Sequence, residues 1–379
     1  MDLRLPEEVA ALQATTRELA MSLLEHEPAF QATGVVSPAV HEALRSLGYF
    51  GLGFPEEYGG TPVSFLAKCV VEAELSRLPP QFWAELRALY GPASKTLLHH
   101  GTPEQKQRWV PGMIRGEIPV AFALTEPHGG SDVGAMRTTA ARCGQGWMLN
   151  GSKIFISNAD KAKLISVFAY TNRSAGPKGG ISCFLLPTDT PGFSLGKVTP
   201  LMGTATPGVH EIIMQDCELP AEALLGEEGR GLAYAMEGLN EGRVSIGAKA
   251  VGMGELALEE AIAFARQRIA FGQPIAEFQA IRHMLADMAT EIHAARLVML
   301  EAAWSRDQAA LTPARASMAK LFCSEAGGRV VDKALQIFGG TGYCRGTIVE
   351  RLYRDIRVLR IYEGSSEVQR NQIAKQLLR

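Results

Sequence analysis

GWMLNGSKIFISNA, residues 146–159, is a run of aromatic and β-branched side chains interrupted by glycine and asparagine. Three runs of the same kind follow it: LISVFAYT at 164–171, ISCFLLPT at 181–188 and VHEIIMQDCELP at 209–220. Short β-rich runs separated by Gly, Pro and Asn are typical of strands joined by turns. We therefore predict a compact antiparallel β domain over residues 121–225.

The segments on both sides of this domain have helical spacing. The first is PEEVAALQATTRELAMSLLEHE at 6–27, and the second is RHMLADMATEIHAARLVMLEAAW at 282–304, whose Met-rich stripe indicates bundle core rather than a cofactor site. We predict an N-terminal α-helical domain over 1–120, a linker at 226–231 and a helical C-terminal domain over 226–379. The chain is thus expected to be mainly α with a middle β domain.

The composition excludes several classes of function. The chain has 379 residues, 46% of them hydrophobic, and a net charge of -2 without a long basic run, which argues against nucleic acid as a partner. No apolar run reaches membrane-spanning length, and the acidic N-terminus resembles neither a signal nor a transit peptide, so we expect a cytoplasmic, bacterial protein. The six cysteines form no CxxC pair, so neither a disulfide framework nor a metal site is expected.

Familiar nucleotide and catalytic motifs fail their context tests. GMGELA at 252–257 matches GxGxxA, but it follows a helical run and not a strand, so a Rossmann site is not predicted. GGSDVG around Ser131 is not a nucleophile elbow, because Val133 occupies the second glycine position.

Four loop-like stretches are rich in glycine, hydroxyl groups or arginine, and a fifth places a carboxylate between a hydrophobic pair and a glycine. The four are AFALTEPHGGSDV at 121–133, GSKIFISNA at 151–159, RIAFGQPIAEFQ at 268–279 and QIFGGTGYC at 336–344; the fifth is RIYEGSSEVQR at 360–370. Backbone N–H groups, hydroxyls and guanidinium groups in loops suit a phosphate-bearing ligand. Each stretch alone is more often a turn than a site.

Together, and in this order, these stretches resemble the acyl-CoA dehydrogenase family of flavoproteins over nearly the whole chain. The most specific blocks are ALTEP-x-x-GSD and the C-terminal series Gln-Ile-Phe-Gly-Gly, Arg-Asp-x-Arg and Ile-Tyr-Glu-Gly. The resemblance implies an N-terminal helical domain, a middle β-barrel-like domain and a C-terminal four-helix bundle. It also implies one FAD per subunit, a homodimer or homotetramer, an acyl-CoA substrate from fatty acid or amino acid catabolism, and an electron-transfer flavoprotein as electron acceptor.

The resemblance also assigns roles to residues. It implies FAD contacts by Phe122, Leu124, Thr125, Gly130, Ser131, Phe155, Ile156, Ser157, Ser365 and Glu367, and contacts with a neighbouring subunit's FAD by Arg268, Phe271 and Gln279. A loop with Gln336, Gly339 and Gly340 would serve the same cofactor. Substrate contacts are implied for Ser131, Asn240, Arg243, Tyr362 and Gly364.

Glu363 is the predicted catalytic base. The α-proton of a thioester is weakly acidic, so a poorly solvated carboxylate with a raised pKa suits its removal. We expect Ile361 and Tyr362 to supply apolar surroundings, and Gly364 to allow close approach. The resemblance adds that the Glu363 backbone N–H and a ribityl hydroxyl hold the thioester carbonyl, and that hydride passes to flavin N5. Some relatives place the base where this chain has Gly242; neighbouring Glu241 should point elsewhere, towards solvent.

Two departures from the family pattern leave the substrate open. The loop after Gly203 carries Ala205 and Pro207 where relatives have Arg and Ser, and QFWAELRALYGPA at 81–93 replaces a more apolar helix. Arg87 on that helix either faces solvent and pairs with Glu85 or with a neighbouring helix, or faces the acyl site and selects an acidic tail. An acyl-carrier-protein substrate, oxygen as acceptor, and a non-catalytic flavin-binding relative stay open as alternatives.

Overall fold

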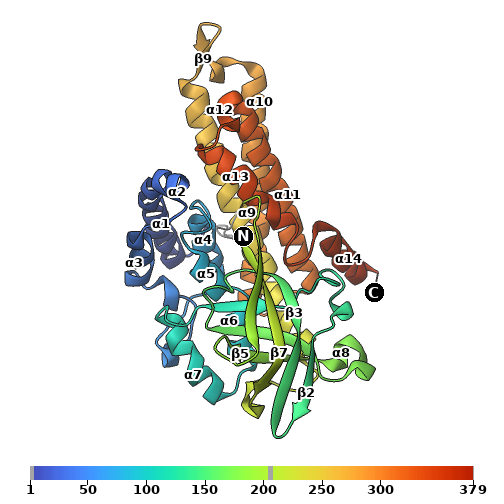
Figure 1. The fold of residues 1–379 in the computed structure, drawn as a ribbon. Coiled ribbons are helices and arrows are strands. Elements are labelled where there is room, and N and C mark those ends of the chain that lie inside the picture. The colour runs from blue at the N-terminus through green and yellow to red at the C-terminus, as the bar shows by residue number, and fades with distance from the viewer. Residues whose placement is uncertain (1–3, 204–207, 379) are drawn as a thin grey trace.

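The computed structural model describes residues 4–203 and 208–378. Figure 1 shows helices from the N-terminal part, a twisted sheet from the middle, and a long helical bundle from the C-terminal part, one end of which lies against the sheet. The predicted fold class, mainly α with a middle β domain, is confirmed. In the altered loop, residues 204–207 lie outside the described residues.

The N-terminal helices lie beside the bundle and the sheet: α4 contacts α9 and α10, and α5 and α6 contact β1 (Figure 1). They are α1 (Glu7–Leu23), α2 (Glu27–Thr33), α3 (Pro38–Ser46), α4 (Phe65–Leu75), α5 (Ala84–Leu89), α6 (Pro92–His100) and α7 (Pro103–Ile114). Thr102 and Gln105 form a capping box at the start of α7, with Pro103 in its first turn. α4 begins at a cap from another helix, because the Asp307 carboxylate accepts hydrogen bonds from the backbone N–H groups of Phe65 and Leu66, at 2.8 and 2.9 Å.

The middle segment forms an eight-stranded sheet. Its strands are β1 (Val120–Ala123), β2 (Thr139–Cys143), β3 (Gly146–Ile156), β4 (Leu164–Tyr170), β5 (Ile181–Pro187), β6 (Phe193–Thr199), β7 (Val209–Leu219) and β8 (Leu224–Leu225), with the short helix α8 (Gly176–Gly180) before β5. The order is β6-β7-β3-β2-β4-β5-β8, and β1 pairs with β4. The prediction of an antiparallel domain is wrong in one respect, because β1 and β2 both pair with β4 in parallel. β1 enters this sheet from helix α7, so its direction is set by a helical connection and not by a hairpin.

The C-terminal segment is built on one long helix, α9 (Gly231–Gln267), which contacts α4, α6, α10 and α11. The other elements are β9 (Ile269–Ala270), β10 (Gln273–Pro274), α10 (Gln279–Asp307), α11 (Pro313–Phe338), α12 (Gly340–Tyr343), α13 (Ile348–Ile356) and α14 (Ser366–Leu377). Met288, Ile292 and Met299 are buried, as the stripe predicted. Gly252 lies inside α9 and not in a Rossmann turn; a Cβ there would overlap the carbonyl of Ala73, so glycine lets α9 and α4 meet closely.

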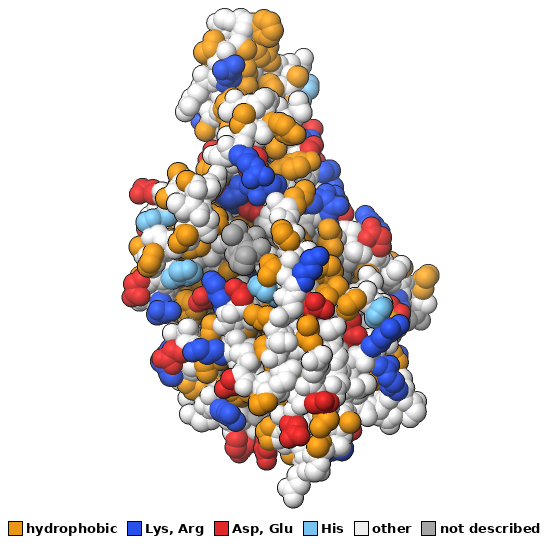
Figure 2. Space-filling model, in the orientation of Figure 1, with side chains coloured by type: hydrophobic (Ala, Val, Ile, Leu, Met, Phe, Trp, Pro, Cys, Tyr) orange, Lys and Arg blue, Asp and Glu red, His pale blue; other side chains and the backbone are white. Residues whose placement is uncertain are grey.

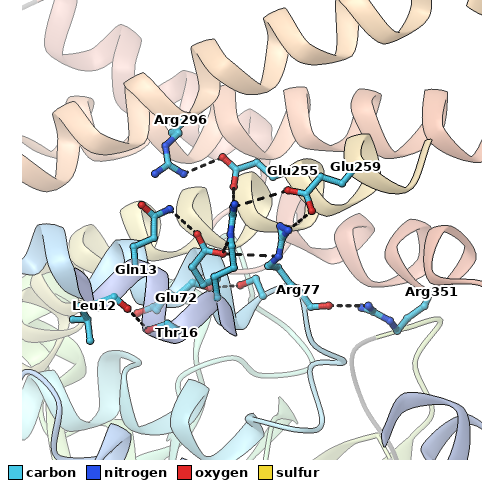
Figure 3. A network of polar contacts seen from close by, with 12 residues as sticks. Leu12, Gln13, Thr16, Glu72, Arg77, Glu255, Glu259, Arg296 and Arg351 are labelled. Atoms are coloured by element: carbon cyan, nitrogen blue, oxygen red, sulfur yellow. Dashed lines mark hydrogen bonds and ion pairs between the residues drawn. The ribbon is translucent and has the colours of Figure 1, made fainter. Parts of the chain in front are cut away.

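A network of charges, centred on the buried Glu74 and Arg77, joins the N-terminal helices to the bundle (Figure 3). The Arg77 guanidinium pairs with Glu259, and Arg296 Nη1 lies 3.0 Å from Glu255 Oε1. Glu74, which is 1% exposed, accepts a hydrogen bond of 3.0 Å from Arg17 Nε. Because these pairs cross between α1, α4, α9 and α10, they fix the relative position of the helices that surround the candidate site.

The described residues contain no helix that combines the length and the apolar character needed to cross a membrane.

Candidate active site

Glu363 lies in a strained turn between two helical segments. It follows the 3-10 turn at Arg357–Arg360 and precedes α14, whose first turn is capped by Ser365. Its φ is 54° and that of Gly364 is 93°. A left-handed glutamate costs of order 1–3 kcal/mol, and such conformations gather at functional sites. The turn is held by the buried Gln369, whose Nε2 donates to the carbonyl oxygens of Glu363 and Gly364, at 3.2 and 2.8 Å.

The carboxylate of Glu363 points at helix α9. A Cβ built on Gly242 would overlap Oε2 of Glu363 and lie 3.1 Å from its Cδ, so no larger residue fits there beside this glutamate. Oε2 is buried and has no hydrogen-bond partner among the described residues. The expectation that Ile361 shields the carboxylate is wrong: Ile361 is 56% exposed, and the backbone of α9 covers the carboxylate instead.

The electrostatic setting of Glu363 is a balance between burial and cations. Burial raises the pKa of Glu363 above its ordinary value, and the charges of Lys249, Lys95 and Lys320 oppose that rise. Lys320 is fully buried on α11, and its Nζ donates a hydrogen bond of 2.6 Å to the Gly364 carbonyl. Sequence reasoning missed Lys320, because no local pattern links it to a turn 43 residues later (363 minus 320).

Glu241 points away from Glu363, as predicted, but not into solvent. Its Oε1 lies 2.8 Å from Arg306 Nε and its Oε2 lies 3.4 Å from Lys95 Nζ, and its side chain is 13% exposed. Burial alone would raise the pKa of Glu241, but the charges of Lys95 and Arg306 together lower it to about 2. A carboxylate that gives up its proton this readily is a poor proton acceptor.

The residues predicted on the substrate side lie on α9, on α5 and next to Glu363. Arg243 is buried, and its Nη1 donates a hydrogen bond of 2.8 Å to Asn240 Oδ1, while its Nε has no partner among the described residues. Arg87 is half-buried and not paired with Glu85, whose carboxylate lies 3.9 Å from Lys161. Burial raises the pKa of Tyr362, and the neighbouring Arg87 cation opposes the rise, so Arg87 lies beside Tyr362.

Several of the predicted flavin contacts come together at the ends of β1 and β3. The backbone N–H of Ile154 donates a hydrogen bond of 3.0 Å to the Thr125 carbonyl, and a Cβ on Gly130 would lie 3.6 Å from Thr125 Cγ2. Phe155 has a φ of 58° and is 57% exposed, with the exposed Ser157 two residues later. Ile156 and Leu124 are buried beneath them, so their side chains support this surface rather than form it.

A buried ion pair, also missed in the sequence, holds this surface in place. Lys153 Nζ lies 2.7 Å from Glu126 Oε1, and both side chains are almost fully buried. Glu126 also accepts hydrogen bonds from the Thr138 hydroxyl and from the N–H groups of Arg137 and Thr138. The glutamate of the ALTEP block therefore fixes the loop that follows Thr125.

The remaining predicted FAD contacts are not brought to this surface. Arg268, Phe271 and Gln279 lie at or beside the β9–β10 hairpin, at the end of the bundle away from the sheet (Figure 1), and Gln336, Gly339 and Gly340 lie where α11 meets α12. Phe271 is 95% exposed, Tyr343 85% and Ile269 57%, and Figure 2 shows hydrophobic side chains gathered over this end. Ser365 is half-buried and Glu367 exposed at the start of α14.

A separate hollow of about 710 Å³ lies between α10, α11 and α14, lined by residues such as Leu297, Phe322 and Ile373. Glu363 does not line it, so this hollow is not where the chemistry described above is placed.

Comparisons with known proteins identify the family and the fold. Family models for the N-terminal, middle and C-terminal domains of acyl-CoA dehydrogenases match residues 6–117, 121–217 and 229–378. The chain is 42% identical to an acyl-CoA dehydrogenase of Bacillus subtilis over 331 residues, 87% of each chain. A structure of butyryl-CoA dehydrogenase from Megasphaera elsdenii is similar with a TM-score of 0.94, 35% identity and full coverage of both chains. A structure reported with the electron transferring flavoprotein of Acidaminococcus fermentans is similar with a TM-score of 0.95, 37% identity and full coverage of both. The chain belongs to the acyl-CoA dehydrogenase family, whose members are FAD-dependent oxidoreductases.

Proposed function

We propose that the protein dehydrogenates an acyl-CoA thioester between its α- and β-carbons, with Glu363 as the base that removes the α-proton. The observation that carries the proposal is Oε2 of Glu363, which is buried, has no hydrogen-bond partner within the described part of the chain and is placed against Gly242 in a strained turn. A desolvated carboxylate with a raised pKa is suited to accept a proton from a weak carbon acid.

The residues present fit FAD. Thr125, Gly130, Phe155 and Ser157 form one exposed surface at the ends of β1 and β3, and Phe155 offers an aromatic face where a flavin ring can stack. Backbone N–H groups and hydroxyls of this loop can donate to the polar edge of the ring. When bound there, FAD supplies a two-electron acceptor for the hydride that leaves the β-carbon.

The chain's own residues carry the other steps. Arg243, with Asn240 as its hydrogen-bond partner, holds the CoA portion, and its Nε, which has no partner in residues 4–203 and 208–378, supplies this contact. The backbone N–H of Glu363 donates to the thioester carbonyl and stabilises the enolate that develops. Glu363 takes the α-proton, one hydride leaves the β-carbon, and a trans-2-enoyl thioester is formed.

The proposal extends to partners. The relative whose structure was reported with an electron transferring flavoprotein supports such a protein as electron acceptor. One group of predicted FAD contacts lies at the ends of β1 and β3 and the other at the end of the bundle away from the sheet, where large hydrophobic side chains such as Phe271 and Tyr343 are exposed. We infer that a second subunit brings them together, in a homodimer or homotetramer.

The test is anaerobic flavin bleaching by a panel of acyl-CoA thioesters. Glu363→Gln should abolish bleaching while FAD stays bound, because the amide keeps the shape of the side chain but cannot accept the proton. Glu241→Gln is the matched control, one residue from Gly242, and should retain most activity. The reverse pattern would show that Glu241 is the base.

The electron acceptor is tested separately with the wild-type protein. Reduction of a dye without hydrogen peroxide is expected of a dehydrogenase. Formation of stoichiometric hydrogen peroxide with no dye reduction would identify an oxidase instead. Activity with an acyl-carrier-protein thioester but with no CoA thioester would show that the carrier is a protein and not CoA.

A further inference from the structure

Glu363 needs a nearby positive charge if it is to act as a base. A buried carboxylate without a hydrogen-bond partner favours its neutral form, and a neutral carboxyl group cannot accept a proton. Oε2 of Glu363 is in this position among the described residues. The charged groups on the elements packed around this turn are therefore candidates for a role in the proposed reaction.

Among these groups, Lys249 has the largest effect on Glu363. Burial raises the pKa of Glu363, the charge of Lys249 opposes the rise more than any other neighbouring charge does, and Glu72 adds to the rise. Lys95 is engaged by Glu241, and Lys320 donates its hydrogen bond to a backbone carbonyl. The titratable and charged groups on the surrounding elements are Glu72 on α4, Arg87 on α5, Lys95 on α6, Glu241, Arg243 and Lys249 on α9, Lys320 and Glu325 on α11, Arg360 and Tyr362 just before Glu363, and Glu367 on α14.

Lys249 lies on the face of α9 that Glu363 meets. Gly242, where the Glu363 carboxylate approaches the helix, and Lys249 are seven residues apart (249 minus 242), which is almost two full helical turns. Lys249 is 7% exposed, so its charge is screened little by water. The helix thus presents the glycine that makes room for the carboxylate and the lysine that acts on it along one stripe.

A second path of contacts leads from Lys249 to the same turn. Lys249 Nζ lies 5.6 Å from the centre of the buried Trp83 ring, and the Arg87 guanidinium lies 5.9 Å from the centre of that ring. Arg87 in turn neighbours Tyr362, the residue before Glu363. Helix geometry and side-chain contacts therefore place Lys249 in the surroundings of Glu363 independently of each other.

Glu72 of the neighbouring helix α4 holds Lys249 in place. Its Oε2 lies 3.5 Å from Lys249 Nζ and also accepts a hydrogen bond from the Ser245 hydroxyl, one turn earlier on α9. The close approach of α4 and α9 where Gly252 faces the carbonyl of Ala73 brings these groups together. Glu72 is fully buried, and its Oε1 has no hydrogen-bond partner in the described chain.

We propose that Lys249 and Glu72 are positioning residues for the proposed reaction: the Lys249 ammonium group is the counter-charge that keeps Glu363 ionised until the thioester binds, and Glu72 holds that ammonium group in place. When the α-C–H bond breaks and the proton joins Glu363, the Glu72 carboxylate still balances Lys249, so no isolated charge is left in the interior. This inference rests on the proposed function, because it requires Glu363 to be the base.

The test is the pH dependence of anaerobic flavin reduction by butyryl-CoA in the FAD-loaded enzyme. Reduction needs ionised Glu363, so its rate rises with pH through the pKa of Glu363. Lys249→Met removes a positive charge, raises that pKa and should move the rise about one pH unit higher, the order expected for one nearby charge. Glu72→Gln removes a negative charge and should move the rise in the opposite direction. Lys249→Arg keeps the charge and should leave the rise close to the wild-type position.

Opposite shifts distinguish this role from a tie between two helices. Both substitutions break the same ion pair, so a tie alone would make their effects alike. Where Lys249→Met fails to fold because Glu72 is left uncompensated, Lys249→Met combined with Glu72→Gln replaces it, and its rise should lie at higher pH than that of Glu72→Gln alone. Glu27→Gln is the matched control, because it breaks a buried ion pair with Arg351, at 2.6 Å, and should lower stability without moving the rise.

Unchanged pH profiles in both Lys249→Met and Glu72→Gln, or shifts of both in the same direction, would overturn this inference. Loss of flavin reduction in Glu363→Gln would then leave the proposed function standing. Flavin reduction that persists in Glu363→Gln would overturn the proposed function and this inference together.

Discussion

Glu363 combines a left-handed backbone, a buried carboxylate oxygen and a neighbouring glycine on another helix. Each feature costs stability: the backbone is strained, and burial disfavours the ionised form. Lys320 and Gln369 hold the turn by hydrogen bonds to backbone carbonyls, so the strain is maintained by the surrounding helices. At the scale of single residues, Glu363 is distinguished from other glutamates by its surroundings.

Lys320 should tune the base. Its charge lowers the pKa of Glu363, so Lys320→Met should raise that pKa further. Because the base must be ionised, flavin reduction rises with pH through this pKa, and the rise should move to higher pH in the variant. Lys320→Arg should move it back towards the wild-type position. Lys333→Met is the control, because Lys333 lies on the same helix but pairs with Asp287 and Glu291 and not with Glu363. An unchanged pH profile with lower FAD content would indicate a purely structural Lys320.

Glu241 should contribute to stability instead of catalysis. Its pKa of about 2 lies below the ordinary value, so its contribution is present above pH ~4.3 and is lost as the pH falls towards 2. The contribution is roughly 3 kcal/mol by linkage. Glu241→Gln should therefore lower the thermal midpoint at pH 7 and lessen its fall between pH 5 and 3. Glu218→Gln, an exposed carboxylate on β7, should leave both unchanged. Equal midpoints for wild type and Glu241→Gln at pH 7 would refute this role.

At the scale of elements, the pair of Glu126 and Lys153 connects the loop after β1 to strand β3. Removing one partner of a buried pair leaves the other charge without compensation, which typically costs about 3–5 kcal/mol. Glu126→Ala should therefore lower the free energy of unfolding by that order, measured by urea denaturation of the FAD-free protein. Glu117→Ala, which breaks an exposed pair with Arg115, should change stability little. A Glu126→Ala protein as stable as the wild type would contradict the anchoring role.

The β9–β10 hairpin presents a strained aromatic residue to the surface. Its two turn residues, Phe271 and Gly272, have φ values of 51° and 79°, as a two-residue hairpin turn requires, although Phe271 is an unusual residue for such a conformation. Phe271 is 95% exposed, so burial of its ring among the described residues does not offset the strain of its backbone. Burial of the Phe271 ring against another subunit would offset this strain.

At the scale of the whole molecule, Arg268 tests whether a neighbouring subunit completes the cofactor site. Arg268→Ala should weaken FAD retention by about 1.5–3 kcal/mol, the value of a charge-assisted hydrogen bond to phosphate. Arg266→Ala, an exposed arginine two residues earlier, is the control. FAD retention is measured by absorbance after gel filtration, which also reports the oligomeric state. A colourless monomer with full activity would contradict both the shared site and the oligomer.

Much of this architecture follows from local patterns in the sequence. The strands appear as β-branched runs, the stripe of Met288 and Met299 marks a buried helix face, and the Thr102 capping box is formed as expected. What escaped prediction depends on contacts between distant segments: Lys320 with Gly364, Lys153 with Glu126, and Gly242 with the carboxylate of Glu363. Ile361 was expected to shield Glu363 because it is an apolar neighbour in the sequence, but it is exposed, since helix α9 covers the carboxylate instead.

The central claim is that Glu363 removes the α-proton of an acyl thioester. The most direct measurement is exchange of that proton with solvent: the FAD-loaded enzyme is incubated anaerobically in D2O with butyryl-CoA, and the recovered thioester is examined by NMR. The wild type should introduce deuterium at the α-carbon, while Glu363→Gln, with FAD bound, should introduce none. Exchange at the wild-type rate in Glu363→Gln would contradict the assignment and place the base elsewhere.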